Sequence, residues 1–219
     1  MERILVDNLI NEVRITLDEN APQSSYLYES SDNIELDDII RSKVVDAVRL
    51  ALEDAPLSFL EPKEVTSPTT KVNDDGSGKI TLPEDFLRLA GLKLKGWNRG
   101  VSIVYNKGSE MDYIQRNKYT RGTATKPVCV FSHTDDGERC IEYFVAAKND
   151  KGYDHTIVDY HYVAIPSIEV DANGGGEFIS FPNLLHFAIV NYCAGLVLTS
   201  RGEQAVGNNF ITLAQNSFK

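Results

Sequence analysis

The chain has 219 residues, of which 42% are hydrophobic and 25% charged, a balance that predicts a soluble globular protein of one or two domains. Three cysteines, Cys129, Cys140 and Cys193, leave at least one thiol unpaired and match no CxxC spacing, which favours a reducing intracellular compartment. The first residues are charged and lack an apolar run of about 7 to 15 residues, so we expect no secretory signal.

The net charge of −10 is unevenly distributed. Residues 1–75 hold 17 acidic and 7 basic residues, whereas residues 76–219 hold 15 of each. Within the second part, residues 86–126 contain nine Lys or Arg and two acidic residues, a local charge of +7. Clustered cations among tyrosines are typical of a nucleic-acid surface, but pairing with the acidic third of an identical subunit explains them equally well.

Two amphipathic helices open the chain. In the first, apolar residues recur at intervals of three and four, at Leu5, Leu9, Ile10, Val13 and Leu17. Pro22 ends this helix, and a polar connector follows. The segment "IELDDIIRSKVVDAVRLALEDAP" repeats the spacing and predicts a second helix, with Asp32 or Asn33 as its cap and Pro56 as its stop.

A β region follows the second helix. Turn residues cluster at 74–78 and a short β-branched run follows, which predicts a hairpin. Further strand candidates lie at residues 92–97, 101–105, 127–133, 140–146 and 156–166. Their short, regular spacing indicates an antiparallel region of about five or six strands.

The chain then returns to helix. Residues 184–198 are apolar nearly all round, which predicts a helix buried between others or at a subunit interface. This run is too short for a confident membrane span, which needs roughly 20 apolar residues. Gly195 has a low helix propensity, which is tolerable in this helix if another backbone packs against the glycine. The last segment continues as helix past Gly202, with Val206, Phe210 and Leu213 on one side.

The element order therefore predicts an α+β fold. We expect a helical bundle domain built from both chain ends, residues 1–60 and 177–219. An antiparallel β domain, residues 61–176, is inserted between them.

Catalytic and metal-binding patterns are weak in this sequence. His133 and the acidic turn at 135–138 could hold a metal, but such a cluster between strands is far more often a solvated turn. His155, Asp159 and His161 share one face of a predicted strand, and an exposed polar face explains them better. GxGxxG, P-loop, GxSxG and HExxH patterns are missing. We therefore expect no enzyme, catalytic residue, metal or cofactor.

The stretch "GKITLPEDFLRLAGLKLKGW", residues 78–97, combines a strand with a proline corner. Pro83 lacks a backbone N–H and cannot continue a central ladder. Glu84 and Asp85 are then expected in the first turn of a short helix, where carboxylates are favourable. The apolar residues after them are expected to pack between the sheet and the helical bundle. The structural corner comprises Leu82, Pro83, Asp85, Phe86, Leu87 and Leu89.

This order of elements resembles the head-to-tail adaptor of short-tailed bacteriophages, the tail tubular protein A-like or portal-proximal ring proteins. The most specific match is the family's "LPxDFLRL" corner, here Leu82, Pro83, Asp85, Phe86, Leu87, Arg88 and Leu89. Gly122 with Pro127, and the strand end from Tyr162 to Pro166, match two looser family features. The sequence departs from the family at "IELDD", which lacks the usual aromatic residue at the start of the second helix.

The resemblance implies a structural virion protein at the capsid–tail junction, made in the host cytoplasm and not bound to a membrane. Such adaptors form a homo-oligomeric ring, commonly of about twelve copies, that docks beneath the portal protein. The ring extends the DNA channel without sequence-specific DNA binding and receives the next tail component, a nozzle or second ring. Phe218 and Lys219 are candidate portal contacts. Candidate charged contacts to a neighbouring subunit or to DNA are Arg99, Arg116, Lys118 and Arg121.

A different class of function stays open. The aromatic and basic residues of the β region could form a ligand-binding module for carbohydrate or nucleic acid. Binding that weakens steeply with salt and requires Arg99, Arg116 or Arg121 would favour this alternative.

Overall fold

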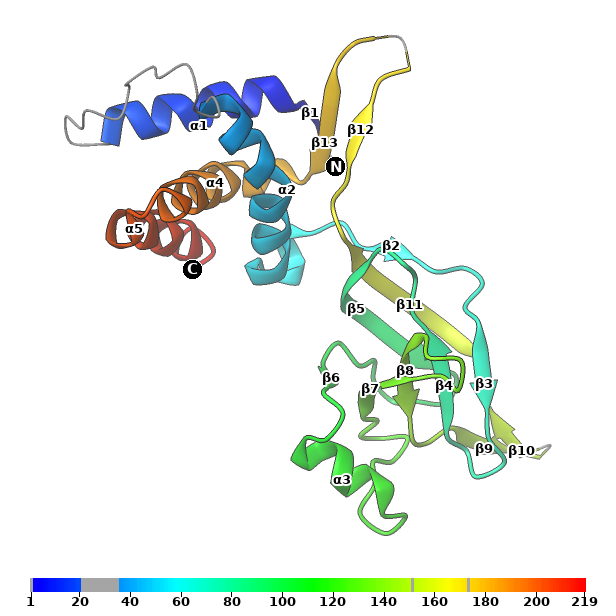
Figure 1. Cartoon of the computed structure of the whole chain (residues 1–219). Helices are drawn as coiled ribbons and strands as arrows, with labels where there is room; N and C mark the ends of the chain where they lie inside the picture. The colour runs from blue at the N-terminus through cyan, green and yellow to red at the C-terminus, as the bar shows by residue number, and fades with distance from the viewer. Residues whose placement is uncertain (1, 21–35, 151, 173) are drawn as a thin grey trace. The chain divides into compact units, whose positions relative to one another are not determined.

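The computed structural model describes the chain over residues 2–20, 36–150, 152–172 and 174–219. The chain divides into two compact units. Residues Met1–Glu61 and Ile165–Lys219 form the first, called here the helical unit, and Pro62–Ala164 form the second, called the β unit. Helices and several small sheets confirm the predicted α+β class (Figure 1).

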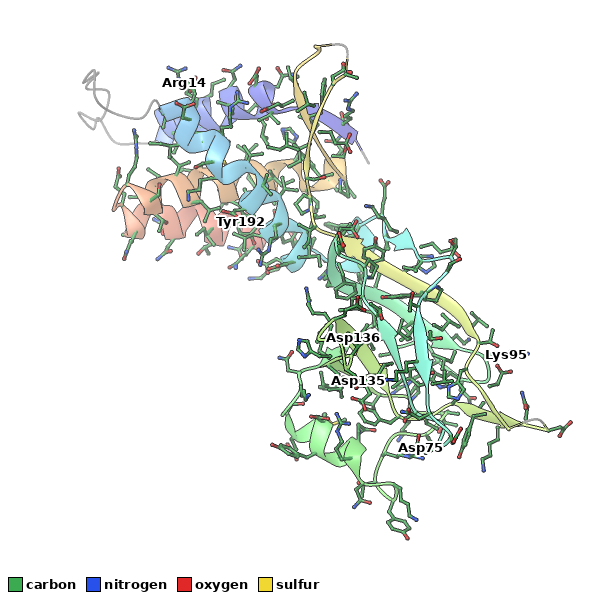
Figure 2. The ribbon with its side chains drawn as sticks, turned by 45° about the vertical axis from the view of Figure 1, so that its right-hand side comes forward. Arg14, Asp75, Lys95, Asp135, Asp136 and Tyr192 are labelled. Atoms are coloured by element: carbon green, nitrogen blue, oxygen red, sulfur yellow. The ribbon has the colours of Figure 1, made fainter. Side chains whose placement is uncertain are left out.

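The helical unit is built around one apolar helix. Its helices are α1 (Val6–Asn20), α2 (Leu36–Asp54), α4 (His186–Ser200) and α5 (Gln204–Asn216). Helix α4 contacts each of the other three, and most of its residues are buried, as its all-round apolar sequence predicts. The Tyr192 hydroxyl of α4 donates a hydrogen bond to Asp54 at the end of α2, and Figure 2 labels this tyrosine. The cap expected for α2 at Asp32 or Asn33 lies outside the described residues.

Helices α4 and α5 approach closely at two glycines. A Cβ built on Gly195 would lie 2.8 Å from the carbonyl oxygen of Gly207, and one on Gly207 would lie 2.7 Å from that of Gly195. The expected backbone contact at Gly195 is therefore confirmed. The predicted apolar side of α5 is wrong at Leu213, which is 47% exposed, because Gly207, Phe210 and Ala214 face the core instead.

Residues Asn183–Ser200 have the length and composition of a membrane-crossing helix. In the structure, 61% of this window is buried within the protein. Burial against α1, α2 and α5 accounts for its apolar character without a bilayer.

A small antiparallel sheet, which the sequence did not predict, belongs to the helical unit. Its strands are β1 (Glu2–Leu5), β13 (Glu177–Phe181) and β12 (Ile168–Val170), in the order β1-β13-β12. Strand β12 pairs with β13, so residues 165–176, which the sequence assigned to the β domain, belong to the helical unit.

The β unit contains two larger sheets and one short helix. The first sheet has the order β2-β11-β5, with β2 (Lys63–Glu64), β11 (Ile157–Ala164) and β5 (Phe86–Leu94). The second has the order β3-β4-β8-β7-β6, with β3 (Thr70–Val72), β4 (Gly78–Thr81), β8 (Arg139–Tyr143), β7 (Cys129–His133) and β6 (Val104–Tyr105). Strands β3 and β4 are the predicted hairpin, and β6 joins β7 in parallel, against the antiparallel expectation. A hairpin of β9 (Ala147–Asn149) and β10 (Gly152–Asp154) and the helix α3 (Glu110–Arg116) complete the unit.

The structural corner is a turn into a strand, and the short helix predicted after Pro83 is wrong. The Phe86 N–H donates to the Pro83 carbonyl at 3.1 Å, which closes a turn around Glu84 and Asp85. Strand β5 begins directly at Phe86. Phe86 stacks on Tyr162, with ring centroids 5.9 Å apart, so its packing lies inside the core of the β unit.

Candidate functional site

Among the residues considered for metal binding, the Asp135 side chain and the His133 backbone are each held by a lysine. Asp135 forms an ion pair with Lys71, whose hydrogen bond lowers the pKa of the carboxyl. The His133 carbonyl accepts a hydrogen bond from Lys79 at 2.8 Å. Figure 2 labels Asp135 and its neighbour Asp136 in the β unit. Within the described parts of the chain, no three His, Cys, Asp or Glu side chains gather in a way that could hold a metal ion.

The expected polar face of β11 is only partly assembled. The Nδ1 atom of His161 lies 2.5 Å from Asp159 Oδ1. His155 precedes the strand and its Nδ1 atom lies 2.7 Å from the Tyr143 hydroxyl instead. Because β11 begins only at Ile157, the strand alternation that grouped these residues does not reach His155.

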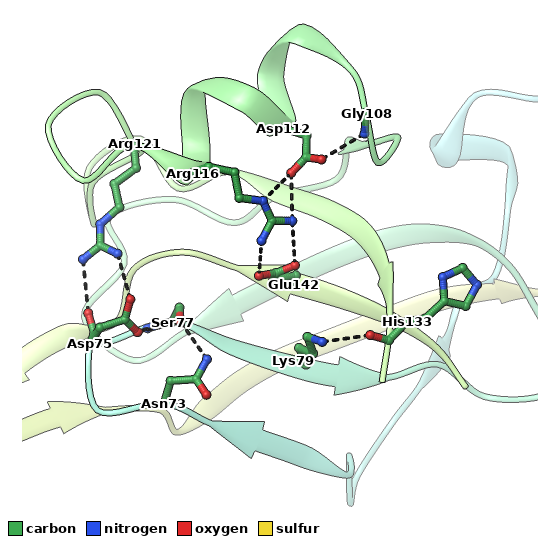
Figure 3. A network of polar contacts seen from close by, with 10 residues as sticks. All are labelled: Asn73, Asp75, Ser77, Lys79, Gly108, Asp112, Arg116, Arg121, His133 and Glu142. Carbon is green, nitrogen blue, oxygen red and sulfur yellow. Dashed lines mark hydrogen bonds and ion pairs between the residues drawn. The ribbon is translucent and has the colours of Figure 1, made fainter. Parts of the chain in front are cut away.

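Polar contacts fix α3 against the second sheet, and Figure 3 shows them. Arg116 forms a bidentate pair with Glu142, with N–O distances of 2.8 and 3.0 Å. Its Nε donates to Asp112 at 2.9 Å. The hydrogen bond to Glu142 and the contacts to Asp112 outweigh the opposing effect of burial and raise the pKa of Arg116. Both carboxylates are buried, so Arg116 acts as an internal clamp.

A second arginine fixes the segment that follows α3. Arg121 donates to the Asp75 carboxylate at 3.2 Å and to the Asp75 carbonyl at 3.1 Å (Figure 3). Asp75 also accepts hydrogen bonds from the Ser77 side chain and backbone, and these lower its pKa more than Arg121 does. Two of the four predicted charged contacts, Arg116 and Arg121, are therefore engaged inside their own β unit.

The other two cationic candidates are exposed. Arg99 makes no ion pair with another described residue. The Lys118 ammonium lies 5.1 Å from the centre of the Tyr119 ring. Tyr119 is 85% exposed and Tyr113, on α3, is 70% exposed. We call Lys118 and Tyr119 the tyrosine surface.

Helix α3, which carries Tyr113 and directly precedes this surface, was not predicted, although a signal exists in the sequence. Ser109 caps the helix by accepting a hydrogen bond from the Asp112 N–H. A Ser followed three residues later by an acidic residue is a capping-box pattern. The rest of α3 lacks a long apolar stripe, which is why periodicity alone passes over it.

A groove of about 500 Å³ lies between α1 and the start of α4 in the helical unit. Three apolar side chains at the groove are exposed: Ile15 to 55%, Leu184 to 70% and Phe187 to 55%. His186 contacts the Glu12 carboxylate across it. The full lining is Glu12, Ile15, Thr16, Asn183, Leu184, His186, Phe187 and Val190. We call this feature the α1–α4 groove; the sequence did not predict it, because its residues come from opposite ends of the chain.

Hydrogen bonds to Asp85 hold the structural corner in place. Asp85 accepts hydrogen bonds from the Tyr162 hydroxyl at 2.7 Å and from Lys63 at 2.9 Å. Burial opposes the charged form of Asp85, but these hydrogen bonds prevail and lower its pKa.

The two predicted portal contacts at the C-terminus are hydrogen-bonded to α5. The Phe218 N–H donates to the Gln215 carbonyl, and the Lys219 ammonium donates to the Asn216 side chain.

Comparison with known proteins identifies the family. The family model described as SU10 adaptor protein matches residues 5–218. A search of curated proteins finds no significant match. The matched range includes both units, the structural corner, the tyrosine surface and the α1–α4 groove. The chain therefore belongs to the SU10 adaptor protein family and is a phage adaptor, a structural protein of the virion's head-to-tail junction.

Proposed function

We propose that this protein forms a ring beneath the portal, extends the DNA channel and attaches the next tail component, a nozzle or second ring. The observation that carries the proposal is the family match, which spans residues 5–218 and so includes both units. The ring contains about twelve copies of the chain. Its two parts are a helical bundle domain built from both chain ends and an inserted β domain.

The charge distribution supports a channel role. The helical unit holds 18 acidic and 7 basic residues, a net charge of −11, whereas the β unit holds 14 acidic and 15 basic residues, a net charge of +1. A protein binds DNA chiefly by neutralising phosphates with Lys and Arg. An acidic surface along the channel lets DNA pass without adhering, so the proposed ring needs no sequence-specific DNA contact and no catalysis.

The experiment is assembly with the portal protein of the same phage. We expect co-expression to give a complex in which electron microscopy shows one ring of this chain on the portal. Removing Phe218 and Lys219 is expected to weaken the complex, because these residues are the proposed portal contacts. Replacing exposed Val158 of the β unit with Thr is the control and leaves the complex intact. A chain that stays unbound in the presence of folded portal contradicts the proposed function.

A further inference from the structure

The α1–α4 groove exposes three apolar side chains to solvent. Ile15 of α1 and Phe187 of α4 are each 55% exposed, and Leu184 is 70% exposed, around one hollow. Single exposed apolar residues are ordinary, but a contiguous apolar patch marks an interaction site. A hollow of about 500 Å³, lined by four apolar and four polar residues, can take up an aromatic side chain with a polar tip from a partner.

The tyrosine surface has the properties of such a partner. At 85%, Tyr119 is the most exposed large hydrophobic side chain of the described residues. Tyrosine is enriched in the energetically important centre of protein interfaces, because it buries a large ring and keeps a polar tip. The clamps formed by Arg116 and Arg121 hold the backbone on either side of Tyr119 against the β unit. A fixed segment loses little conformational entropy when it binds.

Charge favours pairing these two surfaces with each other. The groove belongs to the unit with a net charge of −11 and is lined by Glu12, which is partly exposed. The tyrosine surface carries Lys118 and lies in residues 86–126, which hold nine basic and two acidic residues. Arg116 and Arg121 are paired with carboxylates inside the β unit, so Lys118 is the cation that this surface offers to a partner. Opposite charges on two surfaces speed their encounter and disfavour contact between like surfaces.

We propose that the tyrosine surface of one copy docks into the α1–α4 groove of a second copy. Each chain then offers one surface and accepts the other, which is a head-to-tail contact that closes into a ring or extends into a filament. This interface gives the proposed ring its contact between neighbouring subunits and therefore rests on the proposed function.

The first test measures self-association of the full-length protein by sedimentation velocity over a range of concentrations and salt. We expect wild-type protein to associate, and added salt to weaken the association. Phe187→Gln in the groove and Tyr119→Ser on the tyrosine surface are each expected to weaken association at least about tenfold. Leu213→Gln removes a similarly exposed apolar side chain elsewhere on the helical unit and is expected to leave association unchanged. Protein that stays monomeric at the highest concentration, or variants that associate like wild type, overturn the inference.

The second test mixes the two variants. Phe187→Gln keeps an intact tyrosine surface, and Tyr119→Ser keeps an intact groove. A mixture of them is therefore expected to form a 1:1 dimer that cannot grow, at concentrations where each variant alone is monomeric. A mixture without dimers overturns the inference.

A third test distinguishes a second copy from docking within one chain. A benzophenone amino acid in place of Tyr119 is expected to cross-link to the groove of another molecule and give a product of twice the mass. Cross-linking only within the monomer overturns the inference.

Portal binding separates this inference from the proposed function. If Phe187→Gln and Tyr119→Ser still form complete rings on the portal, only the inferred interface fails. If wild-type protein forms no ring on the portal, the proposed function fails as well.

Discussion

At the scale of single residues, the contacts of the charged side chains decide which of them are available to a partner. Arg116 illustrates this, because sequence alone marks it as a cation in a basic segment. The structure pairs it with two buried carboxylates, Asp112 and Glu142. Desolvated carboxylates need such a partner, so this arginine is expected to matter more for the stability of the β unit than for binding.

Glu142→Gln tests this assignment. The substitution keeps the size of the side chain but removes the charge that Arg116 grips in a bidentate pair. We expect a loss of about 1 to 2 kcal/mol in the free energy of unfolding, measured by urea denaturation, since Arg116 itself is partly exposed. Asp135→Asn breaks the exposed pair with Lys71 and is the matched control, expected to leave stability nearly unchanged. Equal effects of the two substitutions would contradict the clamp.

The hydrogen-bonded Asp85 predicts a pH dependence. Its pKa is lowered in the folded protein, so its contribution to stability is complete above 3.8, the ordinary value, and is lost as pH falls through the lowered pKa. We expect Asp85→Asn to lower Tm at neutral pH, and the difference from wild type to shrink as the pH falls below 3.8. Thermal melts followed by circular dichroism across this range are the measurement. A Tm difference that is constant with pH would show that the charge of Asp85 contributes nothing.

At the scale of elements, β5 shows why part of the fold was predictable and part was not. Its buried residues Phe86, Leu89, Leu92 and Leu94 begin with steps of three, a spacing closer to a helix than to a strand. The pairing with β11 explains the spacing, because Leu87 and Ala90 have no partner across the ladder and form bulges. Bulges depend on the partner strand, so the sequence of β5 alone cannot reveal them. The long apolar pattern of α4 needs no partner to be recognised, and it was predicted.

The tyrosine surface and the α1–α4 groove also depend on contacts between distant segments, and neither was predicted from the sequence. Exposure of Tyr113 and Tyr119 depends on the cap and the clamps of α3, of which only the Ser109 cap has a local sequence signal. The α1–α4 groove joins residues about 170 positions apart, such as Glu12 and His186, and no local pattern encodes that proximity. Regular helices can be predicted from the sequence, but a surface assembled from distant segments requires the fold.

The crossing of α4 and α5 gives an element-scale prediction. Gly195→Ala gains helix propensity but places a Cβ 2.8 Å from the Gly207 carbonyl oxygen, a distance that forces the helices apart. We expect a net destabilisation of about 1 to 3 kcal/mol, measured by urea denaturation. Asn208→Ala, an exposed position of α5, is the matched control and is expected to preserve or slightly raise stability. Unchanged stability of the Gly195 variant would contradict the close approach.

At the scale of the whole molecule, the two units have separate cores and different charges. The core of the β unit contains Phe86, Tyr143 and Tyr160, whereas α4 is the centre of the helical unit. A phage adaptor chain with one acidic unit and one nearly neutral unit has electrostatically distinct surfaces for its partners.

Separate cores predict separate responses to substitution. We expect Gly195→Ala to speed amide hydrogen exchange in α2, α4 and α5, and Glu142→Gln to speed exchange in α3 and β8. Hydrogen exchange followed by mass spectrometry measures both patterns on the full chain. Faster exchange throughout the chain in either variant would show that the two units open together.

The point at which the β unit enters and leaves the chain has a further consequence. Strand β2 begins at Lys63, just after the entry, and β11 ends at Ala164, just before the exit. The two strands are antiparallel neighbours, with Tyr162 opposite Lys63, so the unit begins and ends at one place. A segment with adjacent ends is modular: it can be exchanged for another domain, or replaced by a short linker, without separating the flanking segments. We therefore expect the helical unit to keep its fold when this segment is replaced by a short linker.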